Sequence, residues 1–173
     1  VSLEKITKLY FRYYDALYEM IKDDRGGTYW WCWAPGRLAK LQCDTSAMFS
    51  PGMFKEFMVP VLVEMSARLD YVMYHWDGPG ALPHHDHLLS IKEIDIIQWT
   101  PGAGAEPITD SRWWPYYHKT IDAGKKVALL GFTGTDNLAA LKKEFGRKLG
   151  QFLIGMRVDT PEEAEKILGI VTF

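Results

Sequence analysis

The chain has 173 residues, of which 47% are hydrophobic and 24% are charged, with 20 basic and 22 acidic side chains. This composition excludes a disordered chain and predicts one core-forming domain over residues 1–173. The net charge of -2 gives no broad basic field, so we expect no nucleic-acid partner. Two cysteines and the lack of a long apolar run favour a soluble cytoplasmic protein with no membrane contact.

Helical and extended patterns alternate along the chain. Apolar residues three or four positions apart predict an amphipathic helix over residues 2–24, and Ser50-Pro51 predicts the capped start of a second helix that Pro60 should kink. The expected strands cover residues 38–44, 69–75, 94–99, 126–132 and 151–156. Further helices are expected over residues 84–92, 111–123, 135–145 and 160–168. This alternation is typical of parallel βα units.

Five parallel strands flanked by helices define an α/β fold with right-handed crossovers. A closed eight-stranded barrel needs about 250 residues, so five strands supply only part of one. Because the chain also begins at Val1 rather than at a methionine, we expect it to be a piece of a longer protein.

Polar residues gather where the expected strands end, which is the edge at which parallel α/β proteins place their reactive groups. Asp44 ends the first strand, and His75-Trp76-Asp77-Gly78 ends the second. Residues two apart in a strand point the same way, so His75 and Asp77 can converge on a metal, a proton or a substrate oxygen. In the alternative interpretation, Asp77 caps a turn and His75 is a hydrogen-bonded core histidine.

The segment His84-His85-Asp86-His87 has the composition of a metal cluster, but on a helix only His84 and His87 share a face. A zinc-binding helix usually shows a fuller pattern such as His-Glu-x-x-His. We therefore consider His84 and Asp86 as candidate substrate-binding residues, with a solvated helix start as the alternative.

Seven tryptophans are the other notable feature of the composition. Trp76 and Trp99 end strands and Trp113 follows a long loop, so these rings could wall a pocket for a flat or cationic ligand. In the alternative interpretations these rings are ordinary core residues, or they form an interface with a missing part of the fold. Arg157 follows the last strand and is the remaining candidate for substrate binding.

In this order the elements resemble the carboxyl-terminal part of the uroporphyrinogen decarboxylase superfamily, which also contains cobalamin-dependent methyltransferases. The resemblance covers roughly residues 40–168. It is carried by Asp44 with Ser50-Pro51-Gly52-Met53-Phe54, by His75-Trp76-Asp77-Gly78, by residues 94–99 and by residues 159–163. It implies a TIM (β/α)8 barrel of the uroporphyrinogen decarboxylase type, of which the chain supplies about the last five βα units.

The resemblance also implies a small-molecule substrate, either a methylated compound or a tetrapyrrole, and a corrinoid carried by a partner protein. Zinc methyltransferases of this superfamily carry His-x-Cys on the strand equivalent to the second one here, and a further cysteine after the last strand. This chain has His75-Trp76-Asp77 and Gly155-Met156-Arg157 at those places. A zinc site here would therefore use the His75 imidazole with the carboxylates of Asp77 and Asp44.

Three functions follow from the resemblance. In the first, the full-length protein is an enzyme that moves a methyl group between a small methylated compound and a corrinoid protein. His75 and Asp77 then bind a metal or activate the leaving atom, and Asp44 is a third ligand or a general acid/base. In the second, it decarboxylates a tetrapyrrole (uroporphyrinogen) carboxylate with Arg157 as an anchor. In the third, it is a non-catalytic barrel fragment or binding subunit, whose open strand edges lead to self-association or to pairing with the missing barrel part.

Overall fold

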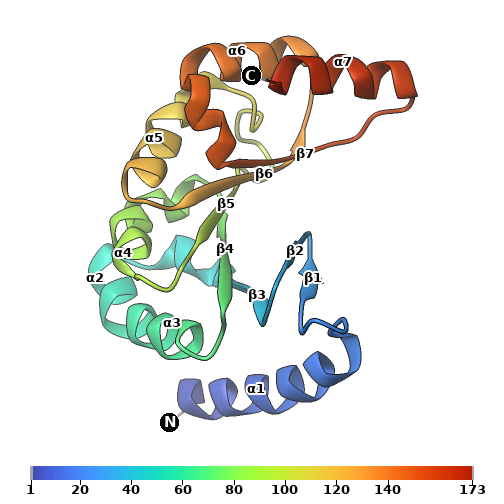
Figure 1. Cartoon of the computed structure of the whole chain (residues 1–173). Coiled ribbons are helices and arrows are strands. Elements are labelled where there is room, and N and C mark those ends of the chain that lie inside the picture. The colour runs from blue at the N-terminus through green and yellow to red at the C-terminus, as the bar shows by residue number, and fades with distance from the viewer. Residues whose placement is uncertain (1, 173) are drawn as a thin grey trace.

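Five parallel strands form a continuous sheet in the computed structural model, which describes residues 2–172 (Figure 1). The strands lie side by side in chain order: β3 (Leu38–Gln42), β4 (Tyr71–Asp77), β5 (Ile96–Thr100), β6 (Lys126–Phe132) and β7 (Phe152–Met156). Each crossover therefore leads to the next strand in the same direction. The parallel α/β class and the five predicted strands are confirmed.

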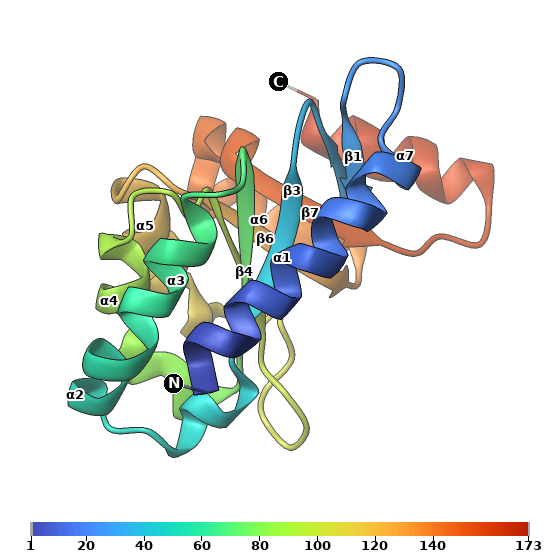
Figure 2. The same cartoon turned by 90° about the horizontal axis from the view of Figure 1, so that it is seen from below.

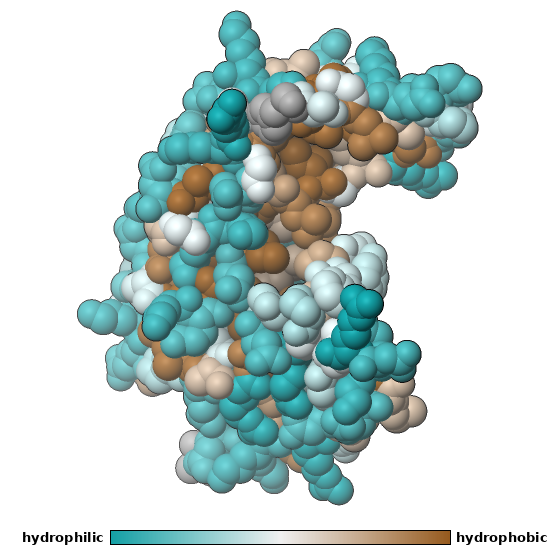
Figure 3. All heavy atoms as spheres, in the orientation of Figure 1, coloured by the Kyte–Doolittle hydropathy of each residue, from teal (hydrophilic) through white to brown (hydrophobic). Residues whose placement is uncertain are grey.

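Helices lie along the convex side of this curved sheet, while its concave side stays open (Figure 1). Those on the convex side are α2 (Pro51–Met53), α3 (Val59–Ser66), α4 (His85–Ser90), α5 (Trp114–Asp122) and α6 (Thr135–Phe145). Helix α1 (Ser2–Ile21) lies at the β3 end of the sheet, and α7 (Pro161–Val171) packs on α6 at the other end. The irregularity expected near Pro60 takes the form of a π-helical turn over Phe54–Met58, directly before α3. Figure 3 shows the resulting hollow, with hydrophobic residues along part of its wall.

Alternate residues of each strand build the core between the sheet and the helices. Tyr74 and Trp76 of β4 are buried in this core together with Ile97 and Trp99 of β5. Because successive side chains of a strand point to opposite faces, their neighbours along the chain face the concave side. The hydrophobic core therefore lies behind the sheet, and the polar residues between the buried ones are free to form a site in front of it.

A short antiparallel hairpin, β1 (Thr28–Trp30) and β2 (Cys32–Ala34), precedes the sheet and was not predicted. Its strands have only three residues each, and Trp31 at the turn has a left-handed φ of 60°, where glycine or asparagine is the usual signal. The Thr28 hydroxyl donates to the Gly36 carbonyl at 2.6 Å and accepts from the Leu38 N–H at 3.1 Å. This threonine fastens the hairpin to the start of β3.

Helix α1 runs past the open edge of β3 (Figure 2). The Tyr14 hydroxyl donates to the Leu38 carbonyl at 3.0 Å, and the Arg37 guanidinium pairs with Asp15. The same guanidinium lies 4.9 Å from the ring centres of Tyr14 and Tyr18. No helix within residues 2–172 is long and apolar enough to cross a membrane.

His85 is a buried imidazole on the helical side of the sheet, only 3% exposed. Its Nε2–H donates to the Thr120 hydroxyl at 2.9 Å, and its ring stacks on Trp76 with 4.3 Å between centres. Burial, and then the nearby Lys119 charge, lower the pKa of His85 to about 4. The folded protein therefore favours the neutral imidazole over the charged one.

This depressed pKa makes stability depend on pH. Between pH 6.5 and pH 4, His85 is protonated in the unfolded chain but stays neutral in the folded protein. The free energy of unfolding therefore falls as the pH is lowered. We expect the free energy of unfolding to drop by about 3 kcal/mol over this interval. Urea unfolding across this range measures the drop, and His85→Gln should flatten it. His118→Gln, which removes a surface imidazole, should retain it; equal slopes in wild type and His85→Gln would contradict the argument.

Candidate functional site

The carboxyl ends of β3 and β4 bring together the three residues that the sequence singled out as catalytic. One ligand atom each of Asp44, His75 and Asp77 lies within 4.8 Å of the other two, and His75 Nε2 is 4.0 Å from Asp77 Oδ2. The register sets Gln42 of β3 beside His75, so Asp44, two residues further on, reaches the end of β4. We call these three residues the Asp-His-Asp cluster.

The cluster faces the open concave side and is reached from solvent. The His75 side chain is 16% exposed and that of Asp77 is 37% exposed, while Asp44 lies on the surface. The loop after β5 passes close to the Asp77 carboxylate. A Cβ placed on Gly102 of this loop would lie 3.8 Å from Asp77 Oδ1. Gly102 has a φ of 79°, a conformation that favours glycine. The loop thus approaches the carboxylate without covering it.

Gln98 of β5, paired in register with His75, decides how the imidazole is oriented. The Gln98 amide nitrogen donates to the Trp99 carbonyl at 3.2 Å and to the Thr100 hydroxyl at 2.6 Å. A backbone carbonyl can only accept, so the amide nitrogen must lie on that side and Oε1 must face His75. Oε1 contacts His75 Nδ1 in a hydrogen bond, so Nδ1 carries the proton.

In the neutral Nδ1–H form of His75, the free electron pair of Nε2 therefore faces the carboxylates of Asp77 and Asp44. Three electron-pair donors that face one another repel unless a proton or a cation lies between them. One imidazole nitrogen and two carboxylate oxygens form a ligand set for a divalent metal, and the Gln98 contact on the other ring nitrogen is the usual support of such a histidine. The chemistry of the cluster thus fits a cation.

The distances fit a metal after a small contraction. Bonds of about 2.1 Å would bring the ligand atoms to within roughly 3.5 Å of one another, compared with the 4.0 Å between His75 and Asp77 and the limit of 4.8 Å for the three atoms together. Asp44 can supply much of this movement, because it begins a surface 3-10 segment, Asp44–Met48. The Gln42 amide nitrogen, 3.2 and 3.3 Å from the two Asp44 oxygens, holds that carboxylate beside the cluster.

The tryptophans proposed as pocket walls lie behind the sheet instead. Trp76 and Trp99 are 2% and 1% exposed, and their rings are 4.7 Å apart in the helix-side core. Trp113 packs 4.9 Å from Trp99 and donates its N–H to the Pro107 carbonyl. The alternation that turns His75 and Asp77 to the front necessarily turns Trp76 to the back. These rings support the site as core packing and are not brought to the cluster.

The other proposed substrate-binding residues also lie away from the cluster. His84 is buried, stacks 4.3 Å from Phe54, and donates from Nε2 to the Ser46 carbonyl, which steadies the segment that begins at Asp44. Asp86 is exposed on α4 and pairs with Lys119 of α5 at 2.5 Å. The Arg157 side chain is 93% exposed and has a carboxylate oxygen of Asp159 3.7 Å away.

Sequence reasoning placed Gln98 at a strand end but gave no role to it, to Gln42 or to Thr100, and it missed a cavity of about 300 Å³ that Thr100 helps to line. Thr100, Gly102, Leu130, Gly131 and Thr133 are among the residues that line this cavity, at the carboxyl ends of β5 and β6. The signal for Gln98 was present, because a glutamine inside an apolar strand needs a partner on the same face. Only the strand register shows that this partner is His75.

The hydrogen bond with Gln98 predicts which tautomer the His75 ring adopts. We expect ¹⁵N spectra of the metal-free protein above pH 8 to show a single Nδ1–H tautomer, because only that form donates to Gln98 Oε1. Gln98→Leu should give a tautomer mixture, while Gln98→Glu restores the Nδ1–H form. The control Gln42→Leu, which removes the glutamine beside Asp44, should leave it unchanged. A dominant Nε2–H tautomer in wild type would refute this geometry.

Comparison with known proteins assigns no family to this geometry. No protein-family model, no curated protein and no solved structure matches the chain. The case for a function therefore depends on the positions of the chain's own residues.

Proposed function

We propose that this chain is the metal-binding part of a uroporphyrinogen decarboxylase-like (β/α)8 barrel, and that the barrel transfers a methyl group between a small methylated compound and a corrinoid protein. The observation that carries the proposal is the Asp-His-Asp cluster at the carboxyl end of a parallel sheet, where barrel enzymes hold their reactive groups. The sequential strand order, and the two sheet edges, β3 and β7, that no further strand of residues 2–172 extends, support a partial barrel.

Each residue of the cluster has a distinct part in this proposal. His75 Nε2, held in place through Gln98, and the carboxylates of Asp77 and Asp44 would bind zinc. Bound zinc supplies Lewis acidity to the heteroatom that carries or leaves the methyl group. In such a transfer the heteroatom would keep the electron pair of its bond to the methyl carbon, and a reduced corrinoid at the cob(I)alamin level, held by the partner protein, would supply the pair for the new bond. The exposed position of Asp44 suits it to donate a proton to the departing heteroatom if it is not a ligand.

The neighbouring cavity favours a small substrate over a tetrapyrrole. Its volume is about 300 Å³, at the lower end of small-molecule sites. Among the described residues that line it, Glu106 is charged and none is basic, so it offers no counter-ion to the carboxylates of a porphyrinogen. Arg157, the anchor considered for that substrate, is 93% exposed and lies beside Asp159 instead. Methyl transfer therefore remains our first proposal and decarboxylation the second.

Zinc affinity tests the cluster directly. We expect His75→Ala and Asp77→Asn each to weaken zinc binding at least about 100-fold, because each removes one of three protein ligands. Competition with a chromophoric chelator measures the affinity. The matched controls, His118→Ala and Asp122→Asn, remove a surface imidazole and a surface carboxylate far from the cluster and should bind zinc like the wild type. Unchanged zinc affinity in both cluster variants would remove the metal site.

The reaction is tested on the full-length protein. We expect methylcobalamin to form from cob(I)alamin and a small methylated amine, thiol or alcohol, with loss of turnover in His75→Ala and Asp77→Asn. Release of CO2 from uroporphyrinogen would support the decarboxylase instead. Zinc binding with neither activity would favour a binding subunit.

A further inference from the structure

Two short 3-10 segments follow the strands that hold the carboxylates of the Asp-His-Asp cluster. The first, which we call the Asp44 segment, covers Asp44–Met48 after β3. The second, the Pro79 segment, covers Pro79–His84 and begins two residues after Asp77. The two segments pack against each other. The distance between the carboxylates of Asp44 and Asp77 therefore depends on how closely these segments approach.

The segments approach closely where Ala47 faces Gly80. A Cβ placed on Gly80 would lie 2.9 Å from the Ala47 Cβ, 3.2 Å from its carbonyl oxygen and 3.3 Å from its Cα. None of these atoms can move away by a change of rotamer, so a larger residue at position 80 would push the segments apart. Ala47 comes three residues after Asp44, and Gly80 comes three residues after Asp77. A separation at this contact is therefore passed to both carboxylates through equally short lengths of chain.

The Pro79 segment is anchored to the core behind the sheet. The Trp76 indole N–H donates to the Ala81 carbonyl at 2.8 Å, and both residues are buried. At the end of the segment the His84 ring stacks 4.3 Å from the ring of Phe54, which is fully buried. This segment is therefore the fixed side of the contact.

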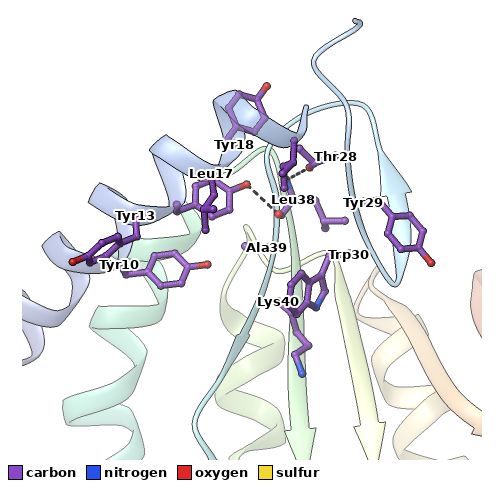
Figure 4. A pocket seen from close by; sticks show the side chains of 12 residues that line it. Tyr10, Tyr13, Leu17, Tyr18, Thr28, Tyr29, Trp30, Leu38, Ala39 and Lys40 are labelled. Carbon is purple, nitrogen blue, oxygen red and sulfur yellow. Dashed lines mark hydrogen bonds between the residues drawn. The ribbon is translucent and has the colours of Figure 1, made fainter. Parts of the chain in front are cut away.

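Strand β3, which leads to Asp44, is also held in place. Figure 4 shows Thr28 and Leu38 at its start, where the Leu38 N–H donates to the Thr28 hydroxyl and the Leu38 carbonyl accepts from the Tyr14 hydroxyl. Leu41, one residue before the strand ends, is buried. The part of the chain that can carry Asp44 toward the rest of the cluster, or away from it, is therefore the Asp44 segment.

A buried hydrogen bond joins the two segments. His84 Nε2 donates to the Ser46 carbonyl at 2.8 Å, and both residues are buried. The same carbonyl accepts from the Phe49 N–H at 2.9 Å, so His84 also holds the turn that ends the Asp44 segment. The hydrogen bond keeps the Asp44 segment against the Pro79 segment, and the contact between Ala47 and Gly80 sets how close the two can come.

We propose that Gly80 and His84 are positioning residues that fit the Asp-His-Asp cluster to a small divalent cation. The inference rests on the proposed metal site and concerns which cation that site selects. Zinc requires the ligand atoms to lie within roughly 3.5 Å of one another, and a glycine at position 80 lets the Asp44 segment come close enough. A Cβ there would hold Asp44 further out, where the three ligand atoms fit a larger cation better. Loss of the His84 hydrogen bond would let the segment move outward as well.

Competition with a chromophoric chelator, carried out with zinc and with the larger cadmium ion, tests the part of Gly80. We expect Gly80→Ala to weaken zinc binding at least about tenfold and cadmium binding less, so that the zinc-to-cadmium affinity ratio falls. Because both ions are compared on the same protein, any loss of folded protein cancels from the ratio.

A compensating substitution and a matched control accompany Gly80→Ala. Ala47→Gly removes the nearest atom that the new Cβ would meet, so the double variant should recover part of the lost ratio. In the control Gly52→Ala, the added Cβ would lie 3.8 Å from Ser50 Oγ, which is an ordinary contact. This control should bind both ions like the wild type.

His84→Phe tests the hydrogen bond, because phenylalanine keeps a ring against Phe54 but has no N–H to donate. We expect faster hydrogen exchange at the Phe49 amide of the metal-free protein, and zinc affinity lower by at least about tenfold. The matched control is His87→Phe, at the other imidazole that stacks on Phe54, with 6.3 Å between ring centres. It should leave the exchange and the zinc affinity unchanged.

The outcomes separate this inference from the proposed function. An unchanged affinity ratio in Gly80→Ala, a ratio that Ala47→Gly does not raise again, or unchanged exchange and affinity in His84→Phe would overturn the positioning roles. If His75→Ala and Asp77→Asn still weaken zinc binding, the metal site itself then stands. A wild-type chain that binds no zinc, or cluster variants that bind it equally well, would remove the metal site and this inference together.

Discussion

The alternation of side chains along parallel, in-register strands is the constraint on which the site depends. One face of β4 carries His75 and Asp77, and the other carries Trp76 in a core of aromatic rings. The register with β5 then sets Gln98 beside His75. A slip of one residue in β4 would place His75 and Asp77 among the tryptophans, and the same slip in β5 would place the Gln98 amide there. The packing that stabilises the sheet therefore also fixes the chemistry in front of it.

Polar contacts next to the cluster fix the tautomer of His75 and the position of the segment that begins at Asp44. The Trp99 carbonyl fixes which way the Gln98 amide points, and Gln98 fixes which nitrogen of His75 carries the proton. His84 tethers the segment that begins at Asp44 through the Ser46 carbonyl. Together they direct one imidazole nitrogen and two carboxylates at a common point, which is why a cation is the ligand that this arrangement fits best.

The two edges of the sheet differ in how they are covered. β3 and β7 end the sheet without a further strand among residues 2–172, and α1 with the hairpin lies beside the β3 edge. Thr28 and Tyr14 satisfy the backbone of Leu38 at this edge, so the hairpin and α1 cover its beginning. The Asp-His-Asp cluster lies at the opposite, carboxyl ends of β3 and β4.

The sequence by itself predicted the α/β class and the five strands, and it indicated Asp44, His75 and Asp77 as strand-end residues, because apolar periodicity and residue spacing are local properties of a chain. It could not determine the hairpin, whose strands are too short to show a period. It also could not assign Gln98 to His75 or separate Trp76 and Trp99 from the site. Those facts depend on register and on the facing of strands across the sheet, and only tertiary packing, which brings distant residues into contact, decides them.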